Sequence, residues 1–343
     1  MKNFMIVFGI LFAIALTFAT VLAAPISGTK TVGGSGSPDY ATLTAAFSSI
    51  TTNGLGGPVA LVLQSGYNPA TETYPLSLPT NATATNTITI YPAVSGLSIT
   101  SSAVQTVNLN GARYVTIDGR VGGTGNTKDL VIDNTATPGG ASIQFINGAS
   151  NNFIKYCILK GTNNSLGVVF FNWGSGTTGN NNNTIDNCDI RDGVSTPQNG
   201  VYSTGQYPNP TLWNSGNAVS NCNIFNFYGS APSGIHIASG NTDWTITGNS
   251  FYQTTPRSGA TGNPHSAIAI DHGFDAGGNN YVVTNNFIGG SAPNAGGTPW
   301  TLAGGDVFVA MPLGVGTSAR TGACLVPVPT RGRSGGPRGA SFP

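Results

Sequence analysis

The sequence places three acidic side chains and one basic side chain in one short segment. Asp186, Asp189 and Asp192 are spaced three residues apart, and Arg191 lies between the last two. Enzymes that hydrolyse polysaccharides use two carboxyl groups about 5 to 9.5 Å apart. Asp186 and Asp189 alternate with apolar residues, so we expect them to face outward on a common surface. Asp186, Asp189 and Arg191 are therefore the first candidates for catalysis.

A second candidate pairs a histidine with a carboxylate. His236 and Asp271 belong to neighbouring repeat units and are expected to be diagonal neighbours. A His–Asp pair can act as a general base. The sequence has no nucleophile motif such as Gly-x-Ser-x-Gly. No metal site is predicted, because the three histidines stand in three different contexts. Of these, His265 lies in a loop with Gly and Pro and is expected to be solvated.

Aromatic and cationic residues form a third pattern. Lys160, Arg191, Phe225 and Tyr252 each follow the last apolar position of a short strand. Stacked rings and cations on a flat face suit sugar rings, which bind through ring stacking and hydrogen bonds. These four residues are the predicted carbohydrate contacts. Tyr202 and His236 are a second outward pair, and Trp173, Trp213 and Trp300 lie in predicted loops.

The elements that position these residues recur along the chain. Five segments share the pattern Ile/Val-x-x-Cys/Asn-x-apolar, and their fourth positions are 31, 34, 27 and 37 residues apart. The segments are 154–159, 185–190, 219–224, 246–251 and 283–288. A second set of short apolar strands lies between them, at 143–145, 168–170, 201–203, 235–237 and 268–270. Each unit thus holds at least two very short strands separated by turns rich in Gly, Asn and Ser.

One such unit cannot bury its apolar face alone, whereas stacked units can do so at about 4.8 Å per strand. The apolar phase changes within the pattern, which predicts a corner where Asn or Gly tolerates left-handed backbone angles. Earlier segments between Ile88 and Ile132 fit the same arrangement less regularly. The sequence therefore predicts an all-β solenoid of parallel strands.

The repeat also bears on the first catalytic candidate. In the next unit Ser220 and Asn223 occupy the positions of Asp186 and Asp189, so no carboxylate from that unit supports them. Perturbed carboxylates need burial or close partners. A solvated surface face is therefore favoured over catalysis for this segment, and the same test disfavours the pair of His236 with Asp271.

Three cysteines share one inward column of the repeat. Cys157, Cys188 and Cys222 occupy its fourth position, which Asn249 and Asn286 continue. Parallel side-chain vectors do not favour a disulfide even at one strand spacing. We predict a buried stack of thiols that act as small apolar filler, with the asparagines hydrogen-bonded along the axis as a ladder.

The segment from Asp39 to Ile50 carries the one clear helical pattern. Leu43, Phe47 and Ile50 are spaced i, i+4, i+7, and Ser37 or Asp39 is predicted to cap the helix. A solenoid needs its open end covered, because an exposed end strand invites edge pairing. We therefore predict an amphipathic helix that caps the N-terminal end.

The two ends of the chain differ from the repeat. Residues 1–23 have the basic, apolar and small-residue parts of a secretory signal peptide, with cleavage after Ala23. A membrane anchor is the alternative, since the apolar run has about the length of a span. The signal peptide is favoured, so a secreted mature chain without a membrane span is expected. Segments 24–58, 59–319 and 320–343 are predicted to be the cap, the β-helix and an irregular basic tail.

Charged side chains are scarce, with 13 basic and 12 acidic residues among 343 and Glu72 as the single glutamate. A net charge of +1 excludes a charge-driven nucleic-acid binder. A column of like charges at one strand spacing would repel itself, whereas Asn, Thr, Ser and Gly can stack or turn. The composition therefore agrees with a solenoid and leaves few groups to gather for catalysis.

The cap segment and the repeat resemble a known family. Val32–Leu43, followed by Ala45 and Ala46, is similar to the N-terminal cap of pectin-lyase-like proteins. Asn151–Cys157 and its repeats resemble the right-handed parallel β-helix repeats of that superfamily. The region of about 28–303 is most similar to bacterial secreted cell-surface β-helix proteins. The resemblance implies a right-handed solenoid, which the rule for parallel crossovers also predicts.

The resemblance leaves activity open, because the superfamily includes lyases, hydrolases, esterases, adhesins and non-catalytic stalks. Our leading hypothesis is a secreted, surface-associated structural or carbohydrate-contacting module without catalytic activity. Its expected partner is a polysaccharide or cell-surface glycan, and no cofactor is expected. The alternative is a polysaccharide lyase or glycoside hydrolase, and calcium is expected only for a lyase.

Overall fold

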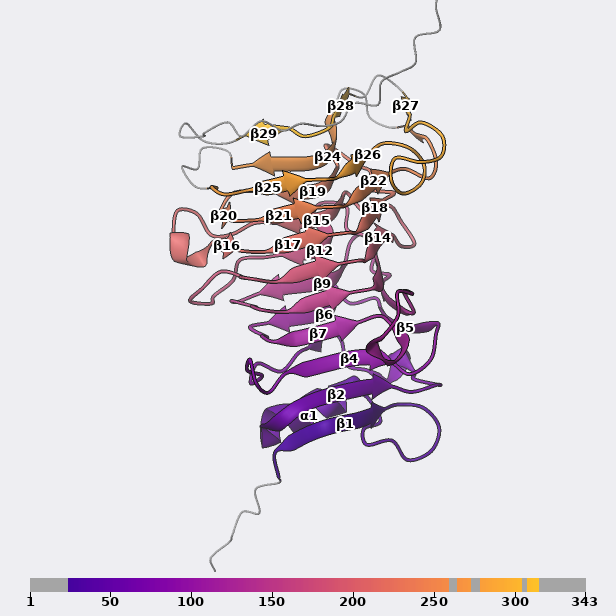
Figure 1. Ribbon diagram of the computed structural model, residues 1–343, viewed down its shortest axis with the longest axis vertical. Coiled ribbons are helices and arrows are strands. Elements are labelled where there is room, and N and C mark those ends of the chain that lie inside the picture. Colours follow the sequence, from indigo (N-terminus) through magenta and orange to yellow (C-terminus); the bar gives the residue numbers. More distant parts are fainter. Residues whose placement is uncertain (1–23, 259–263, 273–277, 304–306, 315–343) are drawn as a thin grey trace, which may run out of the picture.

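A computed structural model describes residues 24–258, 264–272, 278–303 and 307–314 of the chain. Within them the strands stack coil upon coil, with α1 (Leu43–Asn53) beside the first two strands of the stack (Figure 1). Three long sheets form the walls, and every strand pair in them is parallel. The predicted all-β solenoid of parallel strands is confirmed.

From Ile88 to Asp271 each coil contributes one strand to each wall, and we call the walls sheets A, C and B in the order in which these coils meet them. Sheet A contains β1 (Ile26–Val32), β2 (Leu55–Leu63), β4 (Ile88–Pro92), β7 (Val115–Asp118), β10 (Phe153–Lys155), β13 (Thr184–Asp186), β17 (Ala218–Ser220), β21 (Thr245–Thr247) and β25 (Val282–Thr284). Sheet C contains β5 (Leu97–Ser101), β8 (Leu130–Asn134), β11 (Cys157–Gly161), β14 (Asp189–Asp192), β18 (Asn223–Phe225), β22 (Ser250–Tyr252) and β26 (Phe287–Ile288).

Sheet B contains β3 (Leu76–Ser77), β6 (Gln105–Asn110), β9 (Ala141–Ile146), β12 (Gly167–Phe171), β15 (Asn199–Ser203), β19 (Ser233–Ile237), β24 (Pro264–Asp271), β28 (Val307–Val309) and β29 (Leu313–Gly314). Two short pairs lie outside these walls: β16 (Asn214–Ser215) with β20 (Asn241–Thr242), and β23 (Arg257–Ser258) with β27 (Leu302–Ala303). Single 3₁₀ turns span Pro69–Thr71, Val121–Gly123 and Pro210–Leu212.

The corners between sheets A and C have the predicted backbone. Asn187 and Asn221 both have φ of 53°, and Gly248 and Asn285 have φ of 68° and 56° at the same point of later coils. Asn and Gly tolerate this left-handed region better than other residues do. Tyr156 adopts the same angle one coil earlier, with φ of 53°. The one-residue corner explains why the apolar phase changes inside the repeat.

The core is a stack of aliphatic columns and aromatic rings. Ile154 pairs with Ile185, and Ile185 with Val219, so identical or similar side chains lie above one another, all fully buried. Phe145 and Phe171 stack with ring centroids 4.3 Å apart. This burial of like side chains supplies the apolar contact that a single coil lacks.

The helix begins later than the sequence pattern indicates. Thr42 is the residue that caps α1, because its side chain accepts a hydrogen bond from the Ala45 N–H at 3.0 Å. The predicted cap at Asp39 is wrong, since that carboxylate instead accepts hydrogen bonds from the backbone and hydroxyl of Thr31, both at 2.8 Å. The helix ends at Gly54, whose φ is 74°.

The predicted signal peptide (1–23) and basic tail (320–343) lie outside the described residues. Within the predicted cap segment 24–58, β1 is already the first strand of sheet A. Among the described residues, no helix is long and apolar enough to cross a membrane.

Candidate functional site

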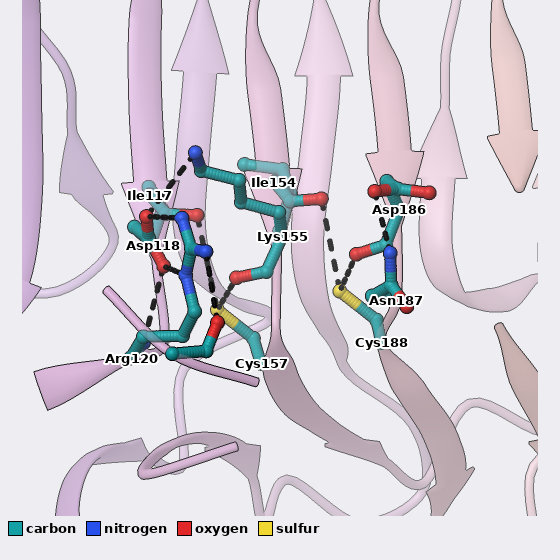
Figure 2. A network of polar contacts seen from close by, with 10 residues as sticks. Ile117, Asp118, Arg120, Ile154, Lys155, Cys157, Asp186, Asn187 and Cys188 are labelled. Carbon is teal, nitrogen blue, oxygen red and sulfur yellow. Dashed lines mark hydrogen bonds and ion pairs between the residues drawn. The ribbon is translucent and has the colours of Figure 1, made fainter. Parts of the chain in front are cut away.

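A network of polar side chains lies on the outer face of sheet A (Figure 2). Asp118, Lys155 and Asp186 are in register on three consecutive coils. Arg120 Nε and Nη2 donate to Asp118 Oδ1 and Oδ2 at 2.9 and 2.7 Å, and Lys155 Nζ lies 3.2 Å from Oδ2. The Asp118 side chain is only 3% exposed. One cation from a strand and one from a turn therefore enclose a single buried carboxylate.

Opposing effects set the pKa of Asp118. Burial tends to raise it, but hydrogen bonds from Arg120 and the charge of Lys155 outweigh burial and hold the pKa below the ordinary value of 3.8. A carboxylate with a depressed pKa in the folded state contributes stability at pH values above 3.8. That contribution is lost as the pH falls through the lower pKa of the folded state.

We expect Asp118→Asn to remove the stability that the charged Asp118 carboxylate contributes, as acid does in the wild type. The variant should be less stable than the wild type at neutral pH, because Arg120 and Lys155 lose their charged partner. Its free energy of unfolding should also fall less steeply below pH 3.8. Urea unfolding at a series of pH values checks this, and parallel pH profiles for the two proteins would contradict it.

The predicted catalytic carboxylates are on different walls. Asp186 ends β13 of sheet A and Asp189 begins β14 of sheet C, with the left-handed corner residue Asn187 between them. The expectation that they share one surface is wrong, because the corner turns the chain from one sheet to the next.

Each of these two carboxylates has its own partners. Asp186 accepts hydrogen bonds from the side chains of Asn187, Ser220 and Asn221 at 2.7, 2.7 and 2.9 Å. Asp189 pairs with Lys128 and accepts a hydrogen bond from Asn223 Nδ2 at 2.7 Å. Ser220 and Asn223 are the in-register residues of the following coil, as predicted. These carboxylates therefore link coils.

The predicted carbohydrate contacts form the column that the sequence indicated, but their rings are covered. Lys160 is in register with Arg191, and Phe225 with Tyr252. The Arg191 guanidinium lies 5.0 Å from the Phe225 ring centroid, and the Tyr252 ring stacks 4.6 Å from Phe225 at an interplanar angle of 9°.

Stacking of these neighbours covers both faces of Phe225. Phe225 is 7% exposed and Tyr252 6% exposed, so the expectation that they present ring faces to sugar is wrong. Burial, with a further contribution from Asp189, raises the pKa of Tyr252 to about 12, against a smaller opposing effect of Arg191. Lys160 Nζ donates to Asp133 Oδ2 at 2.6 Å, so this cation also links two coils.

The second catalytic candidate has the predicted placement. His236 is in register with Ala269, and Asp271 follows two residues later at the end of β24. Burial lowers the pKa of His236, and Asp271 opposes this effect. The neighbouring ring is Tyr202, whose centroid lies 5.1 Å from that of the His236 ring in an edge-to-face arrangement. The expectation that His265 is solvated is wrong, since it is 1% exposed and its ring centroid lies 5.1 Å from that of Tyr228.

The thiol column is confirmed. Cys157, Cys188 and Cys222 are free cysteines and fully buried. Each thiol donates to the carbonyl two residues before it, at 3.3, 3.4 and 3.1 Å. In the two following coils Asn249 Nδ2 donates to Asn286 Oδ1 at 3.0 Å, which continues the column as predicted. Burial raises the pKa of the Cys222 thiol, which favours its unreactive protonated form.

We expect these three thiols to resist modification in the native protein. In a Cys324→Ser variant, which removes the cysteine outside the described residues, a thiol reagent should label fewer than one site per chain before denaturant is added. It should label three sites after unfolding. Absorbance or mass spectrometry counts the labels, and rapid labelling of native protein would contradict the burial of the column.

The sequence interpretation missed two further asparagine ladders. Asn152, Asn183 and Asn217 are fully buried, and their side-chain amides hydrogen-bond to one another at 2.9 and 3.1 Å. Asn180 donates to Asn214 in the same manner at 2.9 Å in a second ladder. The sequence pattern that could have revealed the first ladder is an Asn two residues before the inward Ile or Val of successive units.

Among the described residues, the groove beside α1 is lined by no carboxylate. This groove of about 370 Å³ between α1 and β3 is lined by side chains that are hydroxylic or apolar: Thr44, Phe47, Ser48, Thr51, Thr52, Thr73, Pro75, Leu76 and Ser77. Over the described ranges, no group of three or more His, Cys, Asp or Glu side chains is placed to hold a metal ion.

Comparison with known proteins identified no relative. No family model, no curated protein and no solved structure matches the chain.

Proposed function

We propose that this protein is a secreted, surface-associated structural module without catalytic activity. One observation carries the proposal: five carboxylates on the walls each pair with a side chain of the following coil. The pairs are Asp118 with Lys155, Asp133 with Lys160, Asp186 with Ser220, Asp189 with Asn223, and Asp192 with Asn226. These contacts give each carboxylate a part in joining successive coils, which supports a structural role.

The architecture supports the same proposal. Stacked coils that contact only their neighbours form a stiff rod. Such a rod can hold other parts of a protein at a distance from a surface. We propose that the solenoid is right-handed and of the pectin-lyase-like type, as the repeat pattern and the rule for parallel crossovers suggest. We further propose that α1, which lies beside β1 and β2, caps the N-terminal end.

The alternative of a polysaccharide lyase or hydrolase loses its main support. Its first candidates, Asp186 and Asp189, stand on different sheets with separate partners. Glycoside hydrolysis needs two carboxyl groups that flank the same glycosidic bond within one cleft.

Surface placement can be tested on intact source cells. Antibodies raised against the folded solenoid should label cells that have not been permeabilised, and brief external protease treatment should remove the label. Labelling that appears only after permeabilisation would overturn the proposal. A known cytoplasmic protein probed in parallel controls for lysis.

A further inference from the structure

The C-terminal end of the described solenoid leaves its core uncovered. Ile237 pairs with Ile270, and Ile270 with Leu313, so these side chains form one inward column. Ile237 and Ile270 are fully buried, whereas Leu313 is 51% exposed. Val283 and Ile288 end two other inward columns, and both are only partly buried against the core. The apolar interior therefore reaches the surface at the last described coil.

Exposed apolar side chains gather at this end. Ten large apolar side chains among the described residues are strongly exposed, and five of them belong to β25, β26, β28 and β29. The five are Val282, Phe287, Val307, Phe308 and Leu313. Figure 1 shows these strands at the end of the stack opposite α1. A gathered apolar surface of this kind marks a site of contact.

The last strand of each wall also has an open edge. β25 pairs with β21, β26 with β22 and β28 with β24, and in the part of the chain that the structure describes none of the three has a partner on its other side. An edge strand presents unpaired backbone N–H and C=O groups, which are a template for pairing with another chain. The end thus offers hydrogen bonds as well as apolar contact.

The charge of this end suits contact with a copy of itself. The described residues 278–303 and 307–314 contain no Asp, Glu, Lys, Arg or His, and Asp306 between these ranges lies outside the described residues. Two such surfaces can meet without repulsion between like charges. The opposite end of the solenoid is charged, since Lys30 of β1 and Asp39 form an ion pair there.

The strand order favours joining two C-terminal ends over joining one to an N-terminal end. Of the three walls, only sheet A begins at β1, whereas sheets B and C begin at β3 and β5, after α1 and β2. A head-to-tail stack would extend one wall, leave β26 and β28 unpaired and remain open to further copies. A two-fold axis perpendicular to the solenoid instead sets each last strand antiparallel to one of a second copy, so all three edges are used.

The sequence that follows β29 is a poorer cover for this end. The main apolar run of segment 315–343 is 323–329, and it contains Pro327 and Pro329. Proline has no backbone N–H to donate to the ladder of a neighbouring strand. A second copy of the chain, whose last strands contain no proline, is therefore the better partner for the open edges.

We propose that the C-terminal end of the described solenoid is an interface between two copies of this chain, which join tail to tail. The exposed ends of the columns of Val283, Ile288 and Leu313 meet those of the partner copy and become buried, which is favourable for apolar surface. The dimer is a longer rod with an N-terminal end at each tip. The interface goes beyond the proposed surface function and does not depend on it.

Sedimentation equilibrium of the purified full chain tests this interface. We expect a dimer at about 10 μM chain. Leu313→Asp and Val282→Asp should each raise the dissociation constant about tenfold or more, because the two-fold axis places two new carboxylates in an apolar interface. Val194→Asp is the matched control: Val194 is 66% exposed, follows β14 by two residues and lies far from the end, so this variant should dimerise as the wild type does.

Circular dichroism of each variant verifies folding, and Val282→Asp decides the test if Leu313→Asp unfolds the last coil, because Val282 is an exposed side chain. Hydrogen exchange should show that dimerisation protects residues 282–288 and leaves 43–53 unchanged. High salt should leave the dimer intact, because apolar contacts are not screened as ion pairs are. A monomer, an open series of oligomers, a dimer that high salt dissociates, or dimers of both aspartate variants as stable as the wild type would overturn the proposal.

Discussion

Asn183→Ala should destabilise the solenoid by about 3 kcal/mol. Asn183 Oδ1 accepts from the backbone and side-chain amides of Asn152, and its Nδ2 donates to Ala149 O and to Asn217 Oδ1. Alanine would leave these buried partners without hydrogen bonds, and buried unsatisfied polar groups are costly. The free energy of unfolding in urea, followed by circular dichroism, measures the loss.

An exposed asparagine of the neighbouring coil provides the control. Asn164→Ala removes the same atoms from a site open to solvent and should change the free energy of unfolding by less than about 0.5 kcal/mol. Equal effects of Asn183→Ala and Asn164→Ala would show that the ladder does not hold the coils together.

Glu72→Ala should destabilise the N-terminal end of the solenoid, where Glu72 holds the start of α1. The single glutamate of the chain accepts hydrogen bonds from the backbone amides of Leu43 and Thr44 at 2.6 and 2.8 Å, and from the hydroxyls of Thr44 and Tyr67 at 2.6 and 2.8 Å. Its charge also lies at the N-terminus of α1, where the helix dipole favours an anion. Loss of these bonds should cost about 3 kcal/mol.

Hydrogen exchange with mass spectrometry localises the effect of Glu72→Ala. We expect faster exchange over residues 43–53 and unchanged exchange in sheet A beyond Ile88, because a coil contacts only its neighbours. Glu72→Gln keeps the shape but loses the charge, so its effect should be intermediate. Unaltered protection of α1 in the alanine variant would show that Glu72 does not anchor the helix.

The repeat made much of the architecture predictable from sequence. The thiol column and the corners at Asn187 and Asn221 follow from residue type at fixed positions, because stacked coils place like residues above one another. The asparagine ladder of Asn183 carried the same kind of signal. It was missed because Asn is common in the turns of this chain, so the position two residues before the inward Ile or Val does not stand out.

The polar sites were less predictable, since they depend on more than register. The column of Phe225 and Tyr252 is where the sequence indicated, but whether a ring face is open depends on how it tilts against the next coil. The network of Asp118 with Lys155 was missed because the coils before Asn151 repeat irregularly. Their register becomes apparent only when Ile117 is aligned with Ile154.

We propose that the wall carboxylates link coils and do not act on a substrate. The most direct measurement is product release from a panel of neutral and uronic-acid polysaccharides, with calcium and with a chelator, for the wild type and Asp189→Ala. We predict no turnover by either protein under any condition. Turnover by the wild type that Asp189→Ala abolishes, while the variant remains folded, would contradict the claim.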